Sequence, residues 1–482
     1  MPPQTRGRRR AEVSADSAAA ALLPQPSLPD EIWEQVMSHF TDNRDYFGFG
    51  LVCKRFRDLV RHGAALESTA FLWNGQPGYS SVQRVELFVE WLATRVGRPC
   101  SDLLLQLVPP PVYLGSYAYA SIRQSLWCVL GQLAQQLTVL DSRGSNDLIP
   151  KVGNWTAGFS RLESLSLTSQ DSGLTVTANL AGLTRLTHLG LLATIAQPEF
   201  HQLAEEDAQM ASYRGARLAL PEGNFLPTGL RSLRLGSPLL QTLPLQLSTL
   251  TGLTSLYLES RRQVPVEMLC DRLLPLAPGL RRLHVMSGMA PPAFLPHLAA
   301  FTSLDALDVS RNQWSVDDVP GADGMQQIVD LLQQGLAPLT NLTQPGLADM
   351  ALPALPPAVT TMSGLIYLEC SMNLPSLTLP AGQYLGSIVW LAVDWDTLAS
   401  SAAVMSSLHK LEELCVAVLP AGTEAGATVA AVLRSLAKLP RLSALYCSHE
   451  SYSSNRGVMA AVKRLQRAKP ALQLKSLQEC PF

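Results

Sequence analysis

An apolar pattern, apolar-x-x-Leu-x-x-Leu-x-Leu, recurs from about residue 159 onward and restricts the possible folds more than any other feature of this chain. Between corresponding leucines, the step from Leu165 to Leu189 is 24 residues and the step from Leu368 to Leu391 is 23. A unit this short cannot bury its own leucines, so neighbouring units must stack and share one continuous core. Complete copies begin at Phe159, Leu183, Pro227, Leu250, Phe301, Met362, Leu385, Leu408 and Leu439, and a shorter one begins at Leu280.

The Leu-x-Leu part of each copy predicts a short strand, because residues two positions apart on a strand point to the same face. Helix-forming segments lie between these strands, for example at 264–274, 325–334 and 428–437. The pattern therefore predicts an α/β solenoid. Roughly residues 100–480 resemble the leucine-rich repeat family, and this resemblance implies a curved, horseshoe-shaped array. In that family an Asn after the strand bonds backbone groups at the turn, and the matching residues here are Asn312 and Asn373.

The repeat is irregular at two places. The step from Leu189 to Leu233 is 44 residues, about two periods, so the segment around 193–223 contains either a degenerate repeat or an insertion. Further on, a poor copy of the pattern is formed by Leu336, Leu339 and Leu342.

Residues beside the buried leucines point to the other face of the strands, which is the inner face of a curved array. Tyr, Trp and Arg are frequent binding hot spots, and solenoids bind partners along their concave surface. The acids of the later strands suit a Lys- or Arg-containing segment, whereas the Arg and His of the earlier strands suit acidic or phosphorylated groups. The predicted target-binding residues are Arg234, Tyr257, Arg282, His284, Tyr367, Glu369, Trp390, Asp394 and Glu413.

Near the N-terminus, two short amphipathic helices are predicted between Leu28 and Leu59. Ser27 suits the N-cap of the first helix, and Pro29 suits its opening turn. Apolar residues at helical spacing then give each helix one apolar face. A pair of helices totalling about thirty residues has too small a core to stand alone, so these faces should meet another domain or another chain.

The order of residues in this segment resembles an F-box. Leu28, Pro29, Ile32 and Val36 match the first half of the family's pattern, and the run 51–59 (LVCKRFRDL) matches the second half. By this resemblance, the segment docks on a Skp-type adaptor, which links it to a cullin–RING ubiquitin ligase. The adaptor-binding residues implied are Leu28, Pro29, Ile32, Val36, Leu51, Val52, Cys53 and Phe56.

The predicted organisation has four parts. Residues 1–26 form a disordered tail with an arginine cluster, and residues 27–63 form the helical F-box. Residues 64–150 hold degenerate repeats that also cap the array, and residues 151–482 form the leucine-rich repeat solenoid. The arginine cluster suits a nuclear signal, a transit peptide or a plain flexible tail.

Composition and motifs exclude several classes of protein. The formal net charge is −2, which gives no bulk attraction to nucleic acid. The eight cysteines are scattered singly, which suits reduced thiols in the cytoplasm or nucleus. We expect no secretory signal and no membrane span, because the apolar runs are broken by prolines and polar residues. No catalytic or metal-ligand spacing is present, so we expect neither an enzyme nor a cofactor.

Together these features predict a substrate-recognition subunit of a Skp–cullin–F-box ubiquitin ligase, with a protein as its target. Two alternatives stay open. The first is a leucine-rich repeat scaffold whose F-box-like segment has lost its adaptor, as Tyr46, Gly48 and Gly50 depart from the family's pattern. The second is an F-box receptor for a small ligand, which needs a pocket with a basic floor. The residues that could form this floor are the pairs Arg261-Arg262 and Arg281-Arg282. The sequence does not identify the target.

Overall fold

The computed structural model describes residues 68–73, 88–94, 102–107, 116–145, 151–170, 173–194, 216–312, 314, 324–374, 377–416, 425–447 and 456–477. The predicted tail at 1–26, the predicted F-box at 27–63 and all the residues assigned to adaptor binding lie outside these ranges.

The described residues form a long sheet of fifteen strands, in which neighbouring strands pair in parallel and follow chain order. A second sheet of three short strands consists of β4 (Lys151–Val152), β6 (Leu174–Val176) and β8 (Leu218–Ala219). The long sheet consists of β1 (Ser68–Trp73), β2 (Asp102–Leu107), β3 (Val139–Ser145), β5 (Ser164–Gln170), β7 (His188–Thr194), β9 (Ser232–Gly236), β10 (Ser255–Glu259), β11 (Arg282–Met286), β12 (Ala306–Asp308), β13 (Gln344–Gly346), β14 (Tyr367–Glu369), β15 (Trp390–Val393), β16 (Glu413–Val416), β17 (Ala444–Cys447) and β18 (Gln473–Ser476).

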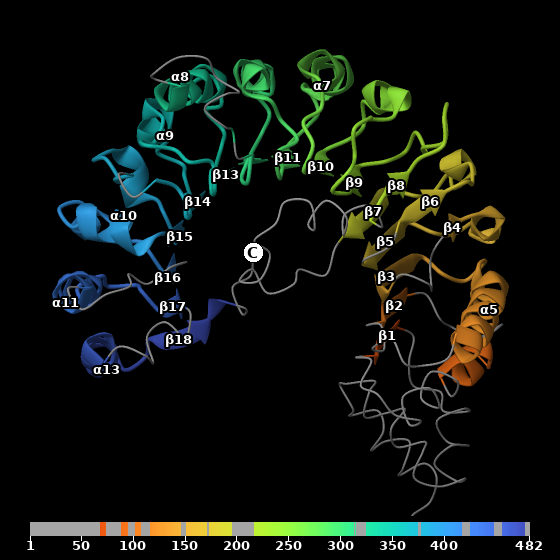
Figure 1. Ribbon diagram of the computed structural model, residues 1–482, viewed down its shortest axis with the longest axis horizontal. Helices are drawn as coiled ribbons and strands as arrows, with labels where there is room; N and C mark the ends of the chain where they lie inside the picture. Colours follow the sequence, from red (N-terminus) through yellow and green to blue (C-terminus); the bar gives the residue numbers. More distant parts are fainter. Residues whose placement is uncertain are drawn as a thin grey trace, which may run out of the picture.

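Helices lie between consecutive strands on the outside of the arc, and the strands line its inside (Figure 1). The α-helices that are described over their full length are α5 (Ser116–Leu133), α7 (Val266–Leu273), α8 (Gly324–Leu336), α9 (Pro357–Thr361), α10 (Trp395–Ser400), α11 (Ala425–Leu436) and α13 (Arg456–Ala468), and residues 88–93 are also helical. The 3-10 helices are η2 (Asn154–Gly158), η3 (Leu180–Gly182), η4 (Leu245–Thr249), η5 (Leu274–Leu276), η6 (Pro292–Ala300), η8 (Gln383–Gly386) and η9 (Met405–Ser407).

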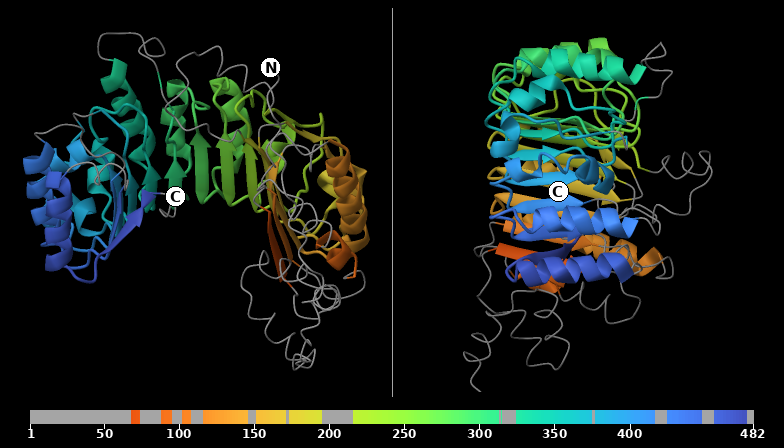
Figure 2. Two further views of the ribbon diagram at one scale, coloured as in Figure 1. Left: turned by 60° about the horizontal axis from the view of Figure 1, so that its bottom comes forward. Right: turned by 90° about the vertical axis from the view of Figure 1, so that its left-hand side faces the viewer.

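The curvature follows from the widths of the two layers. Neighbouring strands lie about 4.8 Å apart, whereas an α-helix with its side chains is about 10 Å wide. The helical layer therefore needs a longer path than the strand layer, and the sheet closes into an arc with the strands on the short side (Figures 1 and 2). The predicted solenoid and its curved, horseshoe-shaped array are confirmed.

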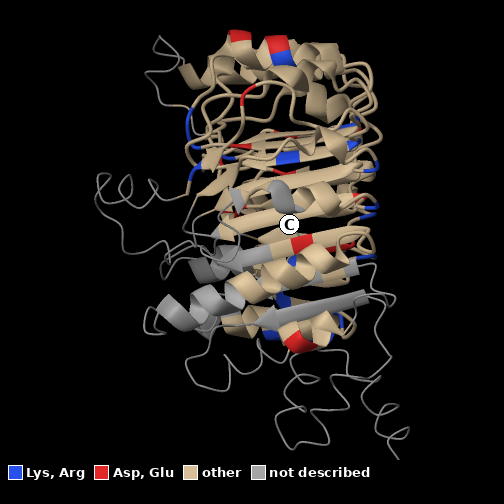
Figure 3. Cartoon of the chain, turned by 90° about the vertical axis from the view of Figure 1, so that its right-hand side faces the viewer, with Lys and Arg blue, Asp and Glu red and all other residues tan. Residues whose placement is uncertain are grey.

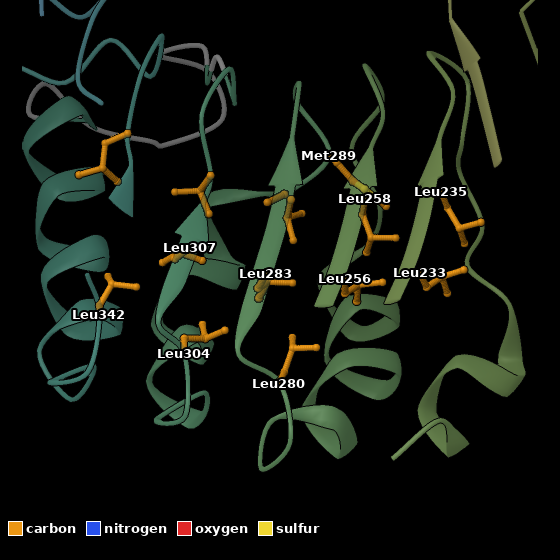
Figure 4. Close-up of a cluster of buried hydrophobic side chains, with 14 of the residues drawn as sticks. Leu233, Leu235, Leu256, Leu258, Leu280, Leu283, Met289, Leu304, Leu307 and Leu342 are labelled. Atoms are coloured by element: carbon orange, nitrogen blue, oxygen red, sulfur yellow. The ribbon is translucent and has the colours of Figure 1, made fainter. Parts of the chain in front are cut away.

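Leucines from neighbouring repeats stack in register behind the sheet. Leu233, Leu256 and Leu283 are paired across β9, β10 and β11, and each is fully buried. A second row, one pleat further along the strands, includes Leu235 and Leu258 (Figure 4). The core is thus shared between repeats along the arc, as the repeat pattern predicts.

The two predicted turn asparagines bond the backbone of the preceding repeat and of their own strand end. Asn312 Oδ1 accepts from the backbone N–H groups of Gly288 and Ala290, and its Nδ2 donates to the carbonyls of Val285 and Val309. Asn373 makes the equivalent four bonds one repeat pair further along. Each amide therefore satisfies four backbone groups where the chain leaves the strand, and this prediction is confirmed.

The structure decides the first irregularity in favour of an insertion. Leu189 of β7 pairs directly with Leu233 of β9, so no strand of the long sheet lies between them. Within the extra segment, the described strand β8 joins the small three-stranded sheet instead.

The register predicted for the poor copy is wrong by three residues. Leu307 pairs with Pro345, and Leu342 lies before β13. The repeat pattern favours Leu342 as the strand residue, because Pro is disfavoured in strands. At this place the strand has only three residues, and Pro345 is buried in the position that leucine holds elsewhere.

At the two ends of the array, the structure adds detail that the repeat pattern did not give. β1, β2 and β3 belong to the same long sheet as the regular repeats. At the other end, β18 is a further repeat strand in which Leu474 pairs with Leu445. The repeat pattern does not mark this last copy, because Ala471 stands three residues before Leu474 and Ser476 two residues after it, at positions where most copies have an apolar residue of larger size.

Three free cysteines of the described residues are buried: Cys415 and Cys447 lie in strands β16 and β17, and Cys370 directly follows β14. Burial raises the pKa of the Cys447 thiol to about 11, so this thiol stays protonated and packs as a small apolar group.

The shared core predicts that the loss of one leucine weakens several repeats. Leu256 is fully buried between Leu233 and Leu283. We expect Leu256→Ala to lower the free energy of unfolding by about 2–5 kcal/mol, measured by urea denaturation, because it leaves a cavity between three repeats. Leu245→Ala is the matched control, since that leucine is 65% exposed. Equal effects of the two variants would contradict the assigned core.

Candidate functional site

The concave side of the sheet carries the residues that alternate with the buried leucines. In β10, Leu256 and Leu258 are buried, whereas Tyr257 and Glu259 are half-buried on the opposite face. Because the strands are parallel and in register, each such residue lies beside its counterpart on the next strand. The central row reads Arg234, Tyr257, His284, Asp308, Gly346, Glu369, Ala392, Cys415, Tyr446 and Lys475.

Tyr257 connects three neighbouring strands. Its hydroxyl donates to Glu259 Oε2 at 2.7 Å, and the guanidinium carbon of Arg234 lies 4.7 Å from its ring centroid. The His284 ring on the next strand lies 5.8 Å from the same centroid. Burial, followed by the charge and the hydrogen bond of Glu259, raises the pKa of Tyr257 and keeps its hydroxyl protonated as a donor. The structure thus brings together three of the predicted binding residues.

Asp308 is held in place from both sides. His284 Nδ1 lies 3.4 Å from Asp308 Oδ2, and the Ser310 backbone N–H donates to Asp308 Oδ1 at 2.9 Å. Burial favours the neutral acid, but the hydrogen bonds from His284 and Ser310 outweigh it and lower the pKa of Asp308. A Cβ on Gly346 would lie 2.6 Å from Asp308 Oδ1, so only glycine leaves room for this carboxylate.

Glu369 follows Gly346 in the central row and is the next acid after Asp308. The Tyr367 hydroxyl donates to Glu369 Oε2 at 3.1 Å. Burial, and then the negative charge of Asp308, raises the pKa of Glu369, although the Tyr367 hydrogen bond and the positive charge of Arg311 oppose this. This part of the concave face therefore carries two neighbouring, half-desolvated acids.

Trp390 is not exposed, contrary to the prediction for inner-face residues. It is 7% exposed and stacks on Tyr367, with ring centroids 4.0 Å apart and ring planes 7° apart. Ala392 on the same strand and Ala444 on β17 are small members of the apolar cluster that Trp390 forms on the concave face, and Tyr367 packs against this cluster. One face of the Trp390 ring is covered by Tyr367, which leaves less of it for a cation from a target.

Glu413 belongs to a separate group at the end of the sheet. It accepts a hydrogen bond from the Tyr446 hydroxyl at 3.0 Å, and Lys475 Nζ donates to that hydroxyl at 3.3 Å. Lys475 Nζ also lies 5.2 Å from the Tyr446 ring centroid. The acid of this group is thus already linked through a tyrosine to a cation of the same chain.

Asp394 lies after the last residue of β15, at the N-cap position of α10. Burial raises the pKa of its carboxyl, and backbone hydrogen bonds from Met372 and Asn373 oppose that rise. These bonds tie Asp394 to the turn of the preceding repeat, which gives it a structural role beside any role in binding.

The earlier strands offer less free positive charge than the sequence predicts. Arg282 Nε lies 4.0 Å from Asp305 Oδ1, and His284 faces Asp308. Arg234 stacks on Tyr257. Of the three predicted basic residues, two therefore already face acids, so the expected preference of this half for acidic groups is weakened.

Sequence reasoning missed two cations that belong to this surface. Arg311 has a left-handed backbone, with φ of 60°, and lies close enough to Glu369 to lower its pKa. Nothing in the repeat pattern marks a turn residue of this kind. Lys475 was missed together with β18, in which Leu474 is the only leucine at a strand position of the pattern.

The described ranges contain no group of three or more His, Cys, Asp or Glu side chains that could hold a metal ion. Among the described helices, none has the length and apolar character that crossing a bilayer requires.

Residues 25–67 match the F-box-like family, and no curated protein matches the chain. Among solved structures, the chain is similar to a leucine-rich repeat protein of Leptospira interrogans, with 16% identity and a TM-score of 0.38 over 87% of this chain and 97% of that chain. It is also similar to the leucine-rich repeat domain of APL1B, with 14% identity and a TM-score of 0.31 over 78% of this chain and 86% of that chain. Because both TM-scores lie below 0.5, the assignment of the fold rests on the strands and leucines described above.

The chain therefore combines a segment that matches the F-box-like family, at residues 25–67, with a curved leucine-rich repeat solenoid that follows it in the sequence. Both parts are of kinds that typically act as non-enzymatic interaction modules.

The raised pKa of Glu369 predicts how its charge affects stability. The fold disfavours the ionised form, so wild-type stability falls as pH rises from the ordinary carboxyl pKa, about 4.3, to the raised value. We expect Glu369→Gln to be more stable than wild type at pH 7 and to lose this advantage at pH 4, because its amide oxygen can still accept from Tyr367. Thermal unfolding across this pH range measures the difference.

Glu222→Gln, at an exposed position, controls for the loss of one negative charge. A Glu369→Gln advantage that is absent at pH 7, or equal at both pH values, would contradict the assigned environment of Glu369.

Proposed function

We propose that this chain is the substrate-recognition subunit of a cullin–RING ubiquitin ligase. The observation that carries the proposal is the F-box-like match at residues 25–67, directly ahead of a solenoid of a kind that binds proteins. The F-box-like segment binds a Skp-type adaptor, and the solenoid binds the protein that is to be ubiquitinated. The chain then needs no catalytic group, since it acts by raising the effective concentration of the target near the ubiquitin-charged enzyme.

The adaptor contact is assigned to the apolar residues of the F-box-like segment. They alternate with charged residues at helical spacing, and a face of this kind suits docking against a helical partner. All eight lie inside the matched range, and they are Leu28, Pro29, Ile32, Val36, Leu51, Val52, Cys53 and Phe56.

The target contact is assigned to the concave face. Tyr257 and Arg234 are held in position by their neighbours, so little side-chain entropy is lost when a partner binds. Half-buried acids lie along the same face at Glu259, Asp308 and Glu369. A target segment that contains Lys or Arg suits this surface best, because its charge can replace the water that these acids have partly lost.

The small-ligand alternative depends on a basic floor made by two arginine pairs, and the fold separates them. Arg261 and Arg262 follow the end of β10, whereas Arg281 and Arg282 stand at the start of β11. Since the two strands are parallel, the pairs lie at opposite edges of the sheet, about 16 Å apart for a strand of five residues. They therefore do not converge on one ligand.

The adaptor contact is tested by Leu28→Ala combined with Pro29→Ala in the full-length chain. We expect the adaptor and cullin to co-purify with the wild type and to be lost from the variant, because the opening turn of the segment loses its apolar contact. Ala substitution of the exposed Leu245 is the matched control. Failure of the wild type to capture an adaptor or a cullin would refute the ligase assignment and favour the scaffold alternative.

The target contact is tested by Glu369→Lys combined with Glu413→Lys in cells where a captured target has been identified. We expect capture to fall about tenfold or more and to become less sensitive to salt, while adaptor capture is unchanged. Glu222→Lys combined with Glu267→Lys changes the net charge equally at exposed positions away from the concave face. Equal capture by wild type and the Glu369/Glu413 variant would eliminate the acidic face as the target contact.

A further inference from the structure

The C-terminal end of the arc differs in charge from the rest of the chain. The full sequence has 37 Lys and Arg against 39 Asp and Glu. From residue 424 to residue 482 the sequence has nine Lys and Arg against three Glu and no Asp. The three acids, Glu424, Glu450 and Glu479, lie outside the described residues, and the described ranges 425–447 and 456–477 hold all nine cations. In contrast, both signs are scattered over the part of the arc that Figure 3 faces. The cations in the two C-terminal ranges are Arg434, Lys438, Arg441, Arg456, Lys463, Arg464, Arg467, Lys469 and Lys475.

Two helices carry most of this charge on the outside of the arc. α11 and α13 lie side by side at its C-terminal end, on the face opposite the concave surface (Figures 1 and 2). A groove with a volume of about 380 Å³ runs between them. It lies behind the sheet and is therefore separate from the proposed target surface.

The groove has an apolar floor and a cationic rim. Leu433 of α11 and Leu465 of α13 are buried, and four alanines from the two helices complete the apolar lining. The polar side chains that line the groove are Arg434 and Arg464, one from each helix, and both are exposed. Each helix contributes residues at positions i, i+3, i+4 and i+7, so one continuous stripe of each helix faces the groove.

Arg434 and Arg464 can form ion pairs with a partner. Arg434 Nε donates to the Ala430 carbonyl at 3.1 Å, which fixes the base of its guanidinium group beside the groove. Neither Arg434 nor Arg464 forms an ion pair with any residue in the described part of the chain. Arg441, by comparison, lies 4.0 Å from Glu412.

We infer that this groove, which we name the α11–α13 groove, docks an acidic segment of a partner protein. A bulky apolar side chain of that segment enters between Leu433 and Leu465, and flanking carboxylates meet Arg434 and Arg464. Arginine suits this role, because its planar guanidinium can bind a carboxylate through two parallel hydrogen bonds. The inference goes beyond target capture, since it assigns a second partner surface on the other side of the sheet.

The shape of the surface favours a protein segment over a membrane. Membrane-surface helices insert exposed large apolar side chains into the lipid. The exposed large apolar residues of the described chain are Leu245, Ile366, Met372 and Leu374, and none of them lies on α11 or α13. Here the apolar groups form the floor of a groove, which admits a side chain but not a flat bilayer.

The test uses the full-length chain and a display library of random 16-residue peptides. We expect wild type to enrich peptides that carry a bulky apolar residue flanked by Asp or Glu. The variant Arg434→Glu with Arg464→Glu should lose this enrichment at least tenfold. Arg231→Glu with Arg281→Glu is the matched control, because these arginines are exposed elsewhere and the change in net charge is the same.

A second variant, Ala468→Phe, fills the groove from an exposed wall position and leaves both arginines in place. It should also lose the enrichment, while thermal unfolding and adaptor capture stay as in wild type. Peptides without acidic bias, enrichment that survives charge reversal, or no enrichment by wild type would each overturn the proposal. Vesicles of phosphatidylserine and single-stranded RNA serve as further probes. Binding of either probe that requires Arg434 and Arg464, without peptide enrichment, would overturn it in favour of that ligand.

Discussion

The burial of leucines between neighbouring repeats is the interaction on which the rest of the structure depends. Leu256 is fully buried because Leu233 and Leu283 lie on either side of it, and neither neighbour belongs to its own repeat. Parallel pairing in register is needed for this contact, since a slip of one residue would turn every leucine toward the solvent. The sheet, the outer helices and the curvature all follow from satisfying this one requirement repeatedly.

The same register decides the composition of the concave face. Residues about two dozen positions apart in sequence become immediate neighbours, which is how Arg234, Tyr257 and His284 form one group. How far an aromatic side chain on this face is buried then depends on the side chains beside it. Tyr257 remains half-buried beside polar side chains, whereas Trp390 stacks on Tyr367 within an apolar cluster and is buried. One geometric rule therefore produces both a polar surface and an apolar cluster on the same face.

Repeat spacing predicts the structural features that depend on positions within one repeat. It does not predict the features that depend on residues of other repeats. The strands and the roles of Asn312 and Asn373 follow from positions within one repeat, and both are visible in the sequence. The position of Pro345 does not follow from its own repeat. Proline disfavours strands, and Pro345 lies in one because it pairs with Leu307 of the preceding repeat. The burial of Trp390 likewise depends on Tyr367 and Ala444, which lie 23 and 54 residues away.

The pairing of groups on the concave face also bears on selectivity. Glu369 already accepts a hydrogen bond from the Tyr367 hydroxyl, so a partner must replace or join that bond. A neutral hydroxyl from a partner would replace the Tyr367 hydroxyl with an equivalent donor, so the binding free energy would change little. A Lys or Arg group would instead form a charge-assisted bond, roughly twice as strong, with a carboxylate that burial and Asp308 have made unfavourable. On the proposed target surface, this half-desolvated acid would therefore favour cationic over neutral segments, and keeping it ionised in this position costs the free protein some stability.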